Sequence, residues 1–592
     1  MPSLVIVLSL QSQAFGQTVR EVPDNYPTAQ LAVDAAANGD IVQFNDSVLG
    51  DFTVNAKQLN FQGVGGWVGT MNATGGADVT ITGMTLYGGT TETDPALISA
   101  GIYCQALTPA AVDATNATVN VIDSTLRCFS TGAIRGDDAD VTVTQSVFEY
   151  NYFDSAINVV GGDLHVEGST FQYNAGFEGG GVHAEADNTE ILTSYFYGNT
   201  TSLGGGGGLY VASDVAYVSG NNFLNNYNLL WWIPGLIVND PSDLLGQDVG
   251  GLVVASGDGA GMYVTDPALA PATSVTVHDN TFCGNLGDVG AGLYVDDVEG
   301  IQIINNRFAD NWSMHLGGGL YVRADSAFID PAHIQNNTFM QNTAGIFPPP
   351  YPPAVVVIGG GGAVALDGTV ADFRNNIIAY TPFGGGVMGV DGADYTIGDL
   401  VTVDYNILFW NCDAAGCPSN SVEDWAQFTG DMNEYALPAT NLPLDPFPVY
   451  FGAGEFNCVP DAFYPTWGSP AVRNGDLTLP NKIDPNFSDI GSYGGPQANV
   501  LDRDGDLFEN IYDCNDEPDQ DGASVYPGAP DICDGLDNDC DGVIDEDFIT
   551  NWYPDADGDG YGDVNFGQPI IDCVQPANTT SNRDDCNDND PT

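Results

Sequence analysis

Between residues 140 and 380 the chain alternates short apolar runs with polar turns, and the pattern recurs about every 25 residues. In each repeat a phenylalanine is followed three residues later by an asparagine, then by glycines and a short apolar strand, as in NNRFADNWSMHLGGGLYV at 305–322. The repeated pairs are Phe148 and Asn151, Phe171 and Asn174, Phe196 and Asn199, Phe223 and Asn226, Phe282 and Asn285, Phe308 and Asn311, and Phe339 and Asn342. Successive phenylalanines lie 23 to 31 residues apart, except for one step of 59 residues. This periodicity indicates a solenoid with one repeat in each coil.

The strand segments are too short and too polar to be stable alone, so we expect them to stack at about 4.8 Å on the strands of neighbouring coils. The phenylalanine is predicted to point inward and to stack on its copies. The asparagine is predicted to adopt the left-handed conformation of a tight corner and to hydrogen-bond along the axis. The glycines predict a second corner, where a side chain would collide. The predicted fold is therefore all-β, a single-stranded parallel β-helix.

The Phe-x-x-Asn and Gly-Gly-(Gly/Ala)-(Leu/Ile/Val) motifs over residues 120–410 resemble the repeats of polymorphic outer-membrane proteins and related bacterial right-handed β-helix proteins. The resemblance implies a right-handed coil. Residues 22–44, VPDNYPTAQLAVDAAANGDIVQF, are similar to the N-terminal cap of such proteins, in which a short amphipathic helix covers the open end of the core. Residues 469–496 are similar to their closing segment.

Residues 4–10, LVIVLSL, form an apolar run that is too short to span a membrane and is typical of a secretory signal peptide cleaved after Gly16. A buried strand is the alternative interpretation. No other segment of the sequence is long and apolar enough to be a transmembrane segment. We therefore divide the chain into a signal peptide (1–16), an N-terminal cap (17–50), a β-helix (51–500) and an acidic region (501–592).

Composition excludes several classes of partner. The chain has 79 acidic and 11 basic residues and a net charge of −68. Nucleic acid and anionic membranes bind to basic surfaces, so neither is an expected partner. A carbohydrate or a surface protein remains as a partner, and the composition does not define an oligomeric state.

Three aspartate-rich loops after residue 500 predict calcium sites, because alternating aspartates on a tight turn direct several oxygens to one point. Counted as positions of a twelve-residue loop, the predicted ligands of the first loop are Asp502, Asp504, Asp506, Asn510 and Asp513. Those of the second loop are Asp537, Asp539, Asp541 and Asp545, with Glu546 as a substitute at the last position. Those of the third loop are Asp555, Asp557, Asp559 and Asp563. An acidic disordered tail is the alternative.

The acidic region resembles the cysteine-containing metal-binding repeats of bacterial surface proteins that are named after the copper-binding protein MopE. The resemblance rests on DCND at 513–516 and again at 585–588, and on PGAPDICDGLDNDCDG at 527–542. Copper prefers nitrogen and sulfur ligands, and no histidine follows His333, so calcium is the expected metal. The second repeat stops at DPT, where the first continues toward VYPGAP, so we expect it to be incomplete.

Eleven cysteines in an exported chain predict disulfide bonds. Cys412 and Cys417 could close a small loop, and Cys104 and Cys128 lie about one coil apart. Small buried thiols are the alternative for these cysteines.

The β-helix sequence gives little support for catalysis. The aspartates of GDDAD at 136–140 are expected to lie at a turn, where Asp140 stacks on Asp163 of the next coil. The chain has two lysines and scattered arginines, whereas a polysaccharide lyase needs basic groups to neutralise and deprotonate a uronate. The five histidines show no paired spacing and are expected to be structural.

Two insertions leave the repeat after an asparagine corner and before the glycines, at 227–256 and at 343–359. They are expected to emerge along one edge of the solenoid. Aromatic side chains there could form a binding wall for sugar rings or for a protein, although burial of the rings as a satellite core is the alternative. The wall would consist of Trp231, Trp232, Trp312, Phe347 and Tyr351.

The sequence as a whole predicts a secreted or cell-surface β-helix protein that binds or presents, and whose C-terminal repeats are stabilised by calcium. A carbohydrate-active enzyme on the same fold and a purely structural stalk remain as alternatives.

Overall fold

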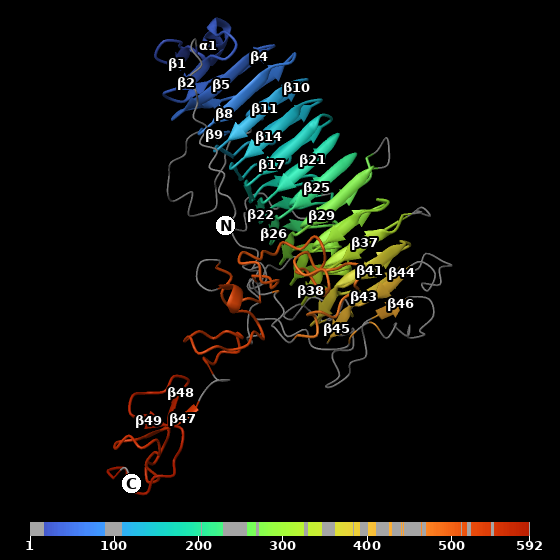
Figure 1. Ribbon diagram of the computed structural model, residues 1–592. Coiled ribbons are helices and arrows are strands. Elements are labelled where there is room, and N and C mark those ends of the chain that lie inside the picture. The colour runs from blue at the N-terminus through green and yellow to red at the C-terminus, as the bar shows by residue number, and fades with distance from the viewer. Residues whose placement is uncertain are drawn as a thin grey trace, which may run out of the picture.

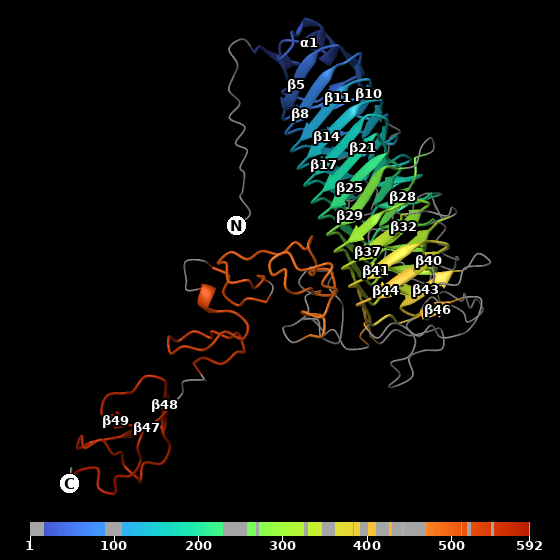
Figure 2. The same cartoon turned by 45° about the vertical axis from the view of Figure 1, so that its right-hand side comes forward.

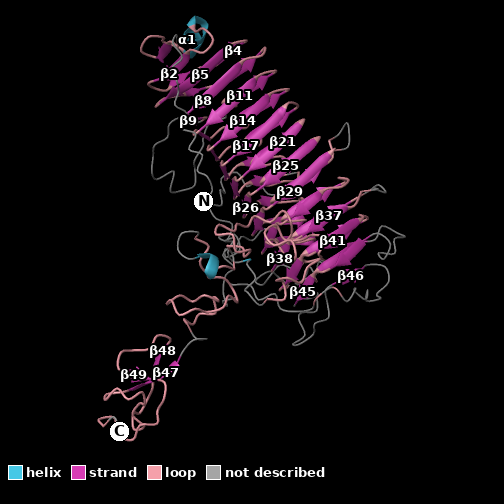
Figure 3. Cartoon of the chain, viewed as in Figure 1, coloured by secondary structure: helices cyan, strands magenta, loops and turns pink. Residues whose placement is uncertain are grey.

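The computed structural model describes residues 17–88, 109–202, 204–228, 257–267, 272–324, 330–345, 361–382, 384–390, 401–409, 426–428, 440, 442, 463, 469–510, 512–517, 522–545 and 550–590. In these residues the chain winds into a long solenoid built almost entirely of parallel strands (Figures 1 and 3). One helix, α1 (Ala29–Ala35), lies at the N-terminal end of the solenoid, as the capping segment predicts. Thr28 caps this helix by accepting a hydrogen bond from the N–H of Leu31.

The described strands of the solenoid form four sheets. The two largest, sheets 1 and 2, run along its length (Figure 2). Sheet 1 contains, in order, β1 (Val19–Val22), β2 (Ile41–Phe44), β5 (Gln58–Gly63), β8 (Asp78–Thr82), β11 (Thr118–Ile122), β14 (Asp140–Thr144), β17 (Asp163–Glu167), β21 (Asn188–Leu192), β25 (Val215–Ser219), β29 (Ser274–His278), β33 (Gln302–Ile304), β37 (Ala332–Gln335), β41 (Ala371–Arg374) and β44 (Val401–Asp404). Sheet 2 contains β4 (Phe52–Asn55), β7 (Met71–Thr74), β10 (Val112–Thr115), β13 (Ile134–Asp137), β16 (Ile157–Val160), β20 (Val182–Glu185), β24 (Leu209–Val211), β28 (Met262–Thr265), β32 (Leu293–Asp296), β36 (Leu320–Arg323), β40 (Val364–Asp367), β43 (Val387–Val390) and β46 (Ala426–Phe428).

Two shorter sheets close the coil. Sheet 3 contains β9 (Thr85–Tyr87), β12 (Thr125–Arg127), β15 (Val147–Glu149), β18 (Thr170–Gln172), β22 (Tyr195–Tyr197), β26 (Asn222–Leu224), β30 (Thr281–Cys283), β34 (Arg307–Ala309), β38 (Thr338–Met340), β42 (Ile377–Ala379) and β45 (Ile407–Phe409). Sheet 4 contains β19 (Ala175–Gly176), β23 (Thr200–Thr201), β27 (Tyr227–Asn228), β31 (Leu286–Val289), β35 (Trp312–Leu316) and β39 (Thr343–Ala344). One coil runs through β29, β30, β31 and β32 before β33 begins the next coil. Outside the four sheets lie the pair β3 (Val48–Leu49) and β6 (Trp67–Val68), and a small C-terminal antiparallel sheet of β47 (Thr550–Pro554), β48 (Ile570–Asp572) and β49 (Thr579–Thr580).

The predicted phenylalanine stack forms the centre of the core. Phe308 is 0% exposed and its ring lies 4.8 Å from that of Phe282 and 4.6 Å from that of Phe339. The other members stack in the same way from Phe148 onward. The glycine corner is also confirmed, because a Cβ atom on Gly292 would lie 2.4 Å from the carbonyl oxygen of Gly319.

The asparagine of the repeat is not left-handed, so that prediction was wrong by one residue. The left-handed residue is the one before it, for example Asp310 with φ 52° and Gln341 with φ 55°. The asparagine points inward instead, because its amide is needed between coils. Asn311 is 0% exposed, donates to the Phe282 carbonyl oxygen at 2.8 Å and to the Oδ1 atom of Asn342 at 2.9 Å.

A second polar ladder, which the repeat analysis missed, lies at the corner between sheets 1 and 3. In the C-terminal coils it consists of buried asparagines such as Asn306, whose Nδ2 atom donates to Oδ1 of Asn337 at 3.1 Å. In earlier coils serines occupy the same place, and Ser169 accepts the N–H of Ser146 at 3.1 Å. Because the residue type changes from serine to asparagine along the chain, this ladder does not appear as a constant sequence motif.

Residues 469–500, here called the strap, run back along the outside of the solenoid over its C-terminal coils. Asn375 contacts Ser488, Asn336 donates to the carbonyl oxygen of Asp489, and Asn305 donates to those of Ser492 and Gly494. Apolar side chains on the outer face of sheet 3 pack against the strap in a second core cluster that includes Met340, Ile377, Ile490 and Tyr493. The segment that resembles a closing element therefore covers a flank of the solenoid.

Candidate metal-binding region

The first acidic loop is a tight turn that gathers three carboxylates. Asp502 accepts hydrogen bonds from the N–H groups of Gly505 at 2.6 Å and Leu507 at 3.2 Å, which curls the chain around it. Ligand oxygens of Asp502, Asp504 and Asp506 all lie within 4.8 Å of one another. Asn510 ties the two ends of the loop together, because its Oδ1 atom accepts the N–H of Leu501 at 2.9 Å.

Two further aspartates from the DCND segment close this loop. Oxygens of Asp513 and Asp516 lie within 4.8 Å of each other and of Asp504. The two residues are only 9% and 8% exposed. Asp516 accepts the N–H of Arg503 at 2.6 Å. Sequence reasoning missed Asp516, although its recurrence in the second DCND segment could have drawn attention to it.

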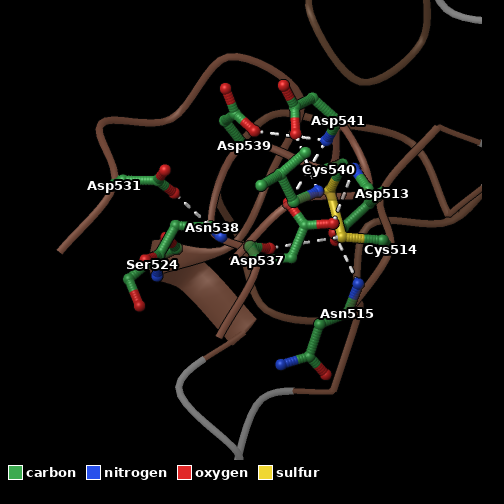
Figure 4. Close-up of a disulfide and its surroundings, with 12 residues drawn as sticks. Asp513, Cys514, Asn515, Ser524, Asp531, Asp537, Asn538, Asp539, Cys540 and Asp541 are labelled. Carbon is green, nitrogen blue, oxygen red and sulfur yellow. Dashed lines mark hydrogen bonds between the residues drawn. A yellow bond between two sulfur atoms is a disulfide. The ribbon is translucent and has the colours of Figure 1, made fainter. Parts of the chain in front are cut away.

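The second loop repeats the arrangement around Asp537, Asp539 and Asp541, whose oxygens also lie within 4.8 Å of one another (Figure 4). Asp537 accepts the N–H groups of Asp541 and Gly542. Asp545 bonds to the segment before this loop, where it accepts the N–H groups of Asp534 and Gly535 at 3.1 Å. Glu546 lies outside the described residues.

Asp531, another residue that the loop template missed, is 1% exposed and lies before the second loop. It accepts the N–H of Asn538 at 3.3 Å (Figure 4). Burial and the nearby charges of Asp541, Asp531 and Asp537 raise the pKa of Asp539.

The third loop is built on Asp555, which accepts the N–H groups of Gly558 and Gly560. Asp557 and Asp559 follow in the same turn. The backbone of Asp563 forms a β-bridge with that of Asp585, so the second DCND segment lies beside this loop.

Two disulfides connect the acidic loops. Cys514 is bonded to Cys540, and Cys533 to Cys573 (Figure 4). Cys514 lies between Asp513 and Asp516, so the first of these bonds links the first loop to the second. The bonded sulfurs are not thiolates and so offer no soft ligand of the kind that copper prefers. Cys128 and Cys283 are also disulfide-bonded, whereas Cys104, Cys412 and Cys417 lie outside the described residues.

The electrostatics of the loops favour a cation. Burial and the neighbouring carboxylates of Asp506, Asp504 and Asp516 raise the pKa of Asp513 to about 6. Burial and nearby aspartates also raise the pKa values of Asp504, Asp506, Asp539 and Asp557. Neighbouring carboxylates repel one another unless a cation lies between them.

Several carboxylate oxygens in these loops are buried but have no hydrogen-bond partner in the structure. They are Oδ2 atoms of Asp504, Asp506, Asp513, Asp516, Asp531, Asp557 and Asp585. A buried carboxylate oxygen without a partner is costly, and hard cations such as Ca²⁺ and Mg²⁺ bind such oxygens. The donor set therefore fits a hard divalent metal ion.

On the β-helix, the acidic residues considered for catalysis lie at turns. Asp140 accepts the N–H of Asp163 in the next coil at 3.2 Å, which matches the predicted stacking. The histidines bond to carboxylates or to backbone, as in His165 with Glu190 at 2.8 Å and His278 with the Gln497 carbonyl oxygen at 2.8 Å.

Of the predicted aromatic wall, only Trp312 belongs to the described residues. It begins β35, is half-buried, and its Nε1 atom donates to the Gly345 carbonyl oxygen at 3.3 Å. The other four side chains, Trp231, Trp232, Phe347 and Tyr351, lie outside the described residues. The strands that precede the two insertions, β27 and β39, both belong to sheet 4 and are separated there by β31 and β35.

The fold and the acidic loops together define a parallel β-helix with a C-terminal metal-binding region. A profile described as "Right handed beta helix region" matches residues 74–378, and the chain belongs to this family. A second profile, described as "Putative metal-binding motif" and of the MopE type, matches residues 513–546. No helix within the described ranges has the length and apolar character needed to cross a membrane.

Two individual proteins are similar to parts of the chain. Metabotropic glutamate receptor-like protein R of Dictyostelium discoideum is 28% identical over 140 residues, which are 23% of this chain and 8% of that protein. The chain thus spans a small fraction of the length of this relative. The Siphovirus 9NA tailspike receptor binding domain aligns with 72% of this chain over 78% of its own length, at 13% identity and a TM-score of 0.21.

Proposed function

We propose that this protein is secreted or displayed on a bacterial cell surface, where its β-helix binds a carbohydrate or a surface protein and calcium stabilises its acidic repeats. The observation that carries the calcium part is the set of buried, unpartnered oxygens of Asp504, Asp506 and Asp513. The two disulfides of the acidic region support an oxidising, extracellular location.

The binding part of the proposal uses the edge formed by sheet 4. Both insertions leave from strands of this sheet, and at about 4.8 Å per coil their departure points lie about 15 Å apart. Trp312 begins a strand between them. An edge of this kind could present Trp231, Trp232, Phe347 and Tyr351 beside Trp312 to a ligand.

A glycan-binding screen, followed by affinity measurement on the best ligand, tests the binding part. Replacing both Trp232 and Trp312 by alanine is expected to abolish binding while the β-sheet circular dichroism is retained. Tyr217→Ala is the control, because Tyr217 is 41% exposed and lies on sheet 1. Unchanged affinity in the double variant would remove the aromatic wall from the proposal, and no ligand in the screen would favour a structural stalk.

One observation favours a carbohydrate-active enzyme as the second candidate. Burial and the charges of Asp288 and Asp296 raise the pKa of Asp258 to about 6, which is suitable for a general acid. The hydroxyl of Tyr263 donates to Asp296 at 2.9 Å on the same face. Turnover on a panel of polysaccharides that is lost in Asp258→Asn would establish this candidate, and no turnover with the wild-type chain would exclude it.

A further inference from the structure

The acidic region contains two copies of one composite arrangement, each made of an aspartate loop and a DCND segment. The first copy combines 502–506 with 513–516, and the second combines 555–559 with 585–588. The loop and its DCND segment are seven residues apart in the first copy (506 to 513) and 26 apart in the second (559 to 585). Strands β48 and β49 of the small C-terminal sheet lie within this longer connection.

The two copies agree hydrogen bond for hydrogen bond. In the first copy the acceptors of backbone N–H groups are Asp502 (from Gly505 and Leu507), Asp504 (from Asp506), Asp506 (from Phe508), Asp513 (from Asn515) and Asp516 (from Arg503). In the second copy they are Asp555 (from Gly558 and Gly560), Asp557 (from Asp559), Asp559 (from Tyr561), Asp585 (from Asn587) and Asp588 (from Ala556). The agreement makes Asp588 the counterpart of Asp516 and Asp585 the counterpart of Asp513.

The first copy shows what these carboxylates are placed to do. Asp513 is 91% buried (100% minus its exposed 9%), its Oδ1 atom accepts the N–H of Asn515, and its Oδ2 atom has no hydrogen-bond partner. That side chain lies within 4.8 Å of ligand oxygens of Asp504 and Asp516. The Oδ2 atom of Asp516 also lacks a hydrogen bond, with Arg503 Nε 3.7 Å away. Buried, unpartnered oxygens that converge from two segments are suited to one shared cation.

The second copy has unpartnered oxygens at two of the four equivalent places. Oδ2 of Asp557 corresponds to that of Asp504, and Oδ2 of Asp585 corresponds to that of Asp513. Both are buried atoms without a hydrogen bond. This copy lies wholly beyond the segment 513–546 that matches the metal-binding profile.

We propose that each copy is one site for a hard divalent cation whose protein ligands are five aspartates drawn from two segments. The first site uses Asp502, Asp504, Asp506, Asp513 and Asp516, and the second uses Asp555, Asp557, Asp559, Asp585 and Asp588. The inference rests on the proposed metal-stabilised region and adds the ligands and their pairing. The cation of the second site holds together two segments that are 26 residues apart, so it closes a long loop of the chain.

The test uses the full chain with Ca²⁺ as the probe and Mg²⁺ in parallel. Calorimetric titration and metal analysis after dialysis are compared for the wild type, Asp516→Asn, Asp588→Asn and the control Asp572→Asn. Asp572 lies in β48 of the same region and accepts the N–H of Val574, which an asparagine also accepts. Each asparagine thus removes one charge but retains the acceptor.

Asp588→Asn is expected to weaken one site at least tenfold and to lower hydrogen-exchange protection of 555–559 and 585–588 only when Ca²⁺ is present. Asp516→Asn should do the same at 502–516, and Asp572→Asn should change neither. In chelator, exchange should be no faster in the variants than in the wild type, because each asparagine retains the acceptor and removes a repelling charge. This result separates a ligand from a structural residue. Unchanged Ca²⁺ affinity in Asp588→Asn, with a wild type that binds Ca²⁺, overturns the pairing proposed here. A wild type that binds no cation overturns the metal-stabilised region itself.

Discussion

The β-helix and the acidic region differ in where their buried polar groups find partners. In the β-helix, the amide of Asn311 is enclosed by the Phe282 carbonyl and by Asn342, so its donors are satisfied within the fold. In the acidic region, Asp513 is almost as deeply buried and keeps an oxygen without a partner. The asparagine ladder of the β-helix satisfies its donors within the polypeptide, whereas the acidic loops gather carboxylate oxygens that a cation could bind.

The two regions also differ in the size of their apolar cores. One continuous cluster of buried side chains extends from Val22 to Leu408 through the solenoid. In the acidic region, the stacked rings of Phe508 and Tyr526 and two disulfides connect the loops. Small segments without a sizeable core generally need disulfides or metals to fold stably.

The largest expected effect belongs to the β-helix core. Phe308→Ala should lower the local free energy of unfolding by about 3 to 5 kcal/mol, because it removes a fully buried ring and leaves a cavity in the stack. Since a solenoid can fray locally, hydrogen exchange around β34 is the measurement, with denaturant unfolding as a second measure. Phe177→Ala is the control, because Phe177 is 54% exposed. Equal effects of the two substitutions would contradict the core assignment, and neither should alter cation binding.

Removal of the metal should affect only the acidic region. At a Ca²⁺ concentration of about 100 times Kd, chelation should cost each site about 2.7 kcal/mol. Limited proteolysis of 501–590 should therefore become much faster in chelator, while the β-helix fragment stays resistant. Equal resistance of the acidic region with Ca²⁺ and with chelator would show that the comparison between the two regions is mistaken.

The smallest effect is a change in the sign of a pH dependence. In chelator, the pKa of Asp513 is raised to about 6, above its ordinary value of 3.8, so the folded state binds protons more tightly than the unfolded state. Stability of 502–516 in chelator should therefore increase as pH falls through about 6 toward 4. With Ca²⁺ present it should decrease over the same interval, because protons compete with the metal. Hydrogen exchange of residues 502–516 at pH 7 and pH 5 measures the pH dependence in chelator and with Ca²⁺. If stability changes in the same direction with pH in both conditions, Asp513 is not a metal ligand.

The sequence predicted the features that recur identically in each coil. The phenylalanine stack and the glycine corner follow from spacing alone. The conformation of the asparagine was assigned one residue too late, because the sequence gives no measure of whether a side chain turns inward. The packing of the strap on the flank of the solenoid was not predicted. Asn305 and Asn336 donate hydrogen bonds to the strap from corner positions, and these positions hold other residue types in earlier coils, so no repeated motif marks the contact.

The sequence also identifies only part of the acidic clusters that the structure brings together. A linear loop template finds Asp502, Asp504 and Asp506, which are adjacent in sequence. It does not find the proposed ligands Asp516 and Asp588, because they approach from a separate segment and the distance along the chain differs between the two copies. The recurrence of DCND at both places contains the information, but only the fold shows which loop each segment joins.

The strap also divides the solenoid into a part that can accept an inserted coil and a part that cannot. It contacts corner residues of four coils, at Asp279, Asn305, Asn336 and Asn375, and each contact needs its coil at a set height. A coil inserted among these four would shift the later contacts by about 4.8 Å and break their match with the strap. A coil inserted nearer the N-terminus would extend the phenylalanine stack and leave every strap contact in place. Evolution or design can therefore lengthen this protein from its N-terminal half without disturbing the link to its acidic region.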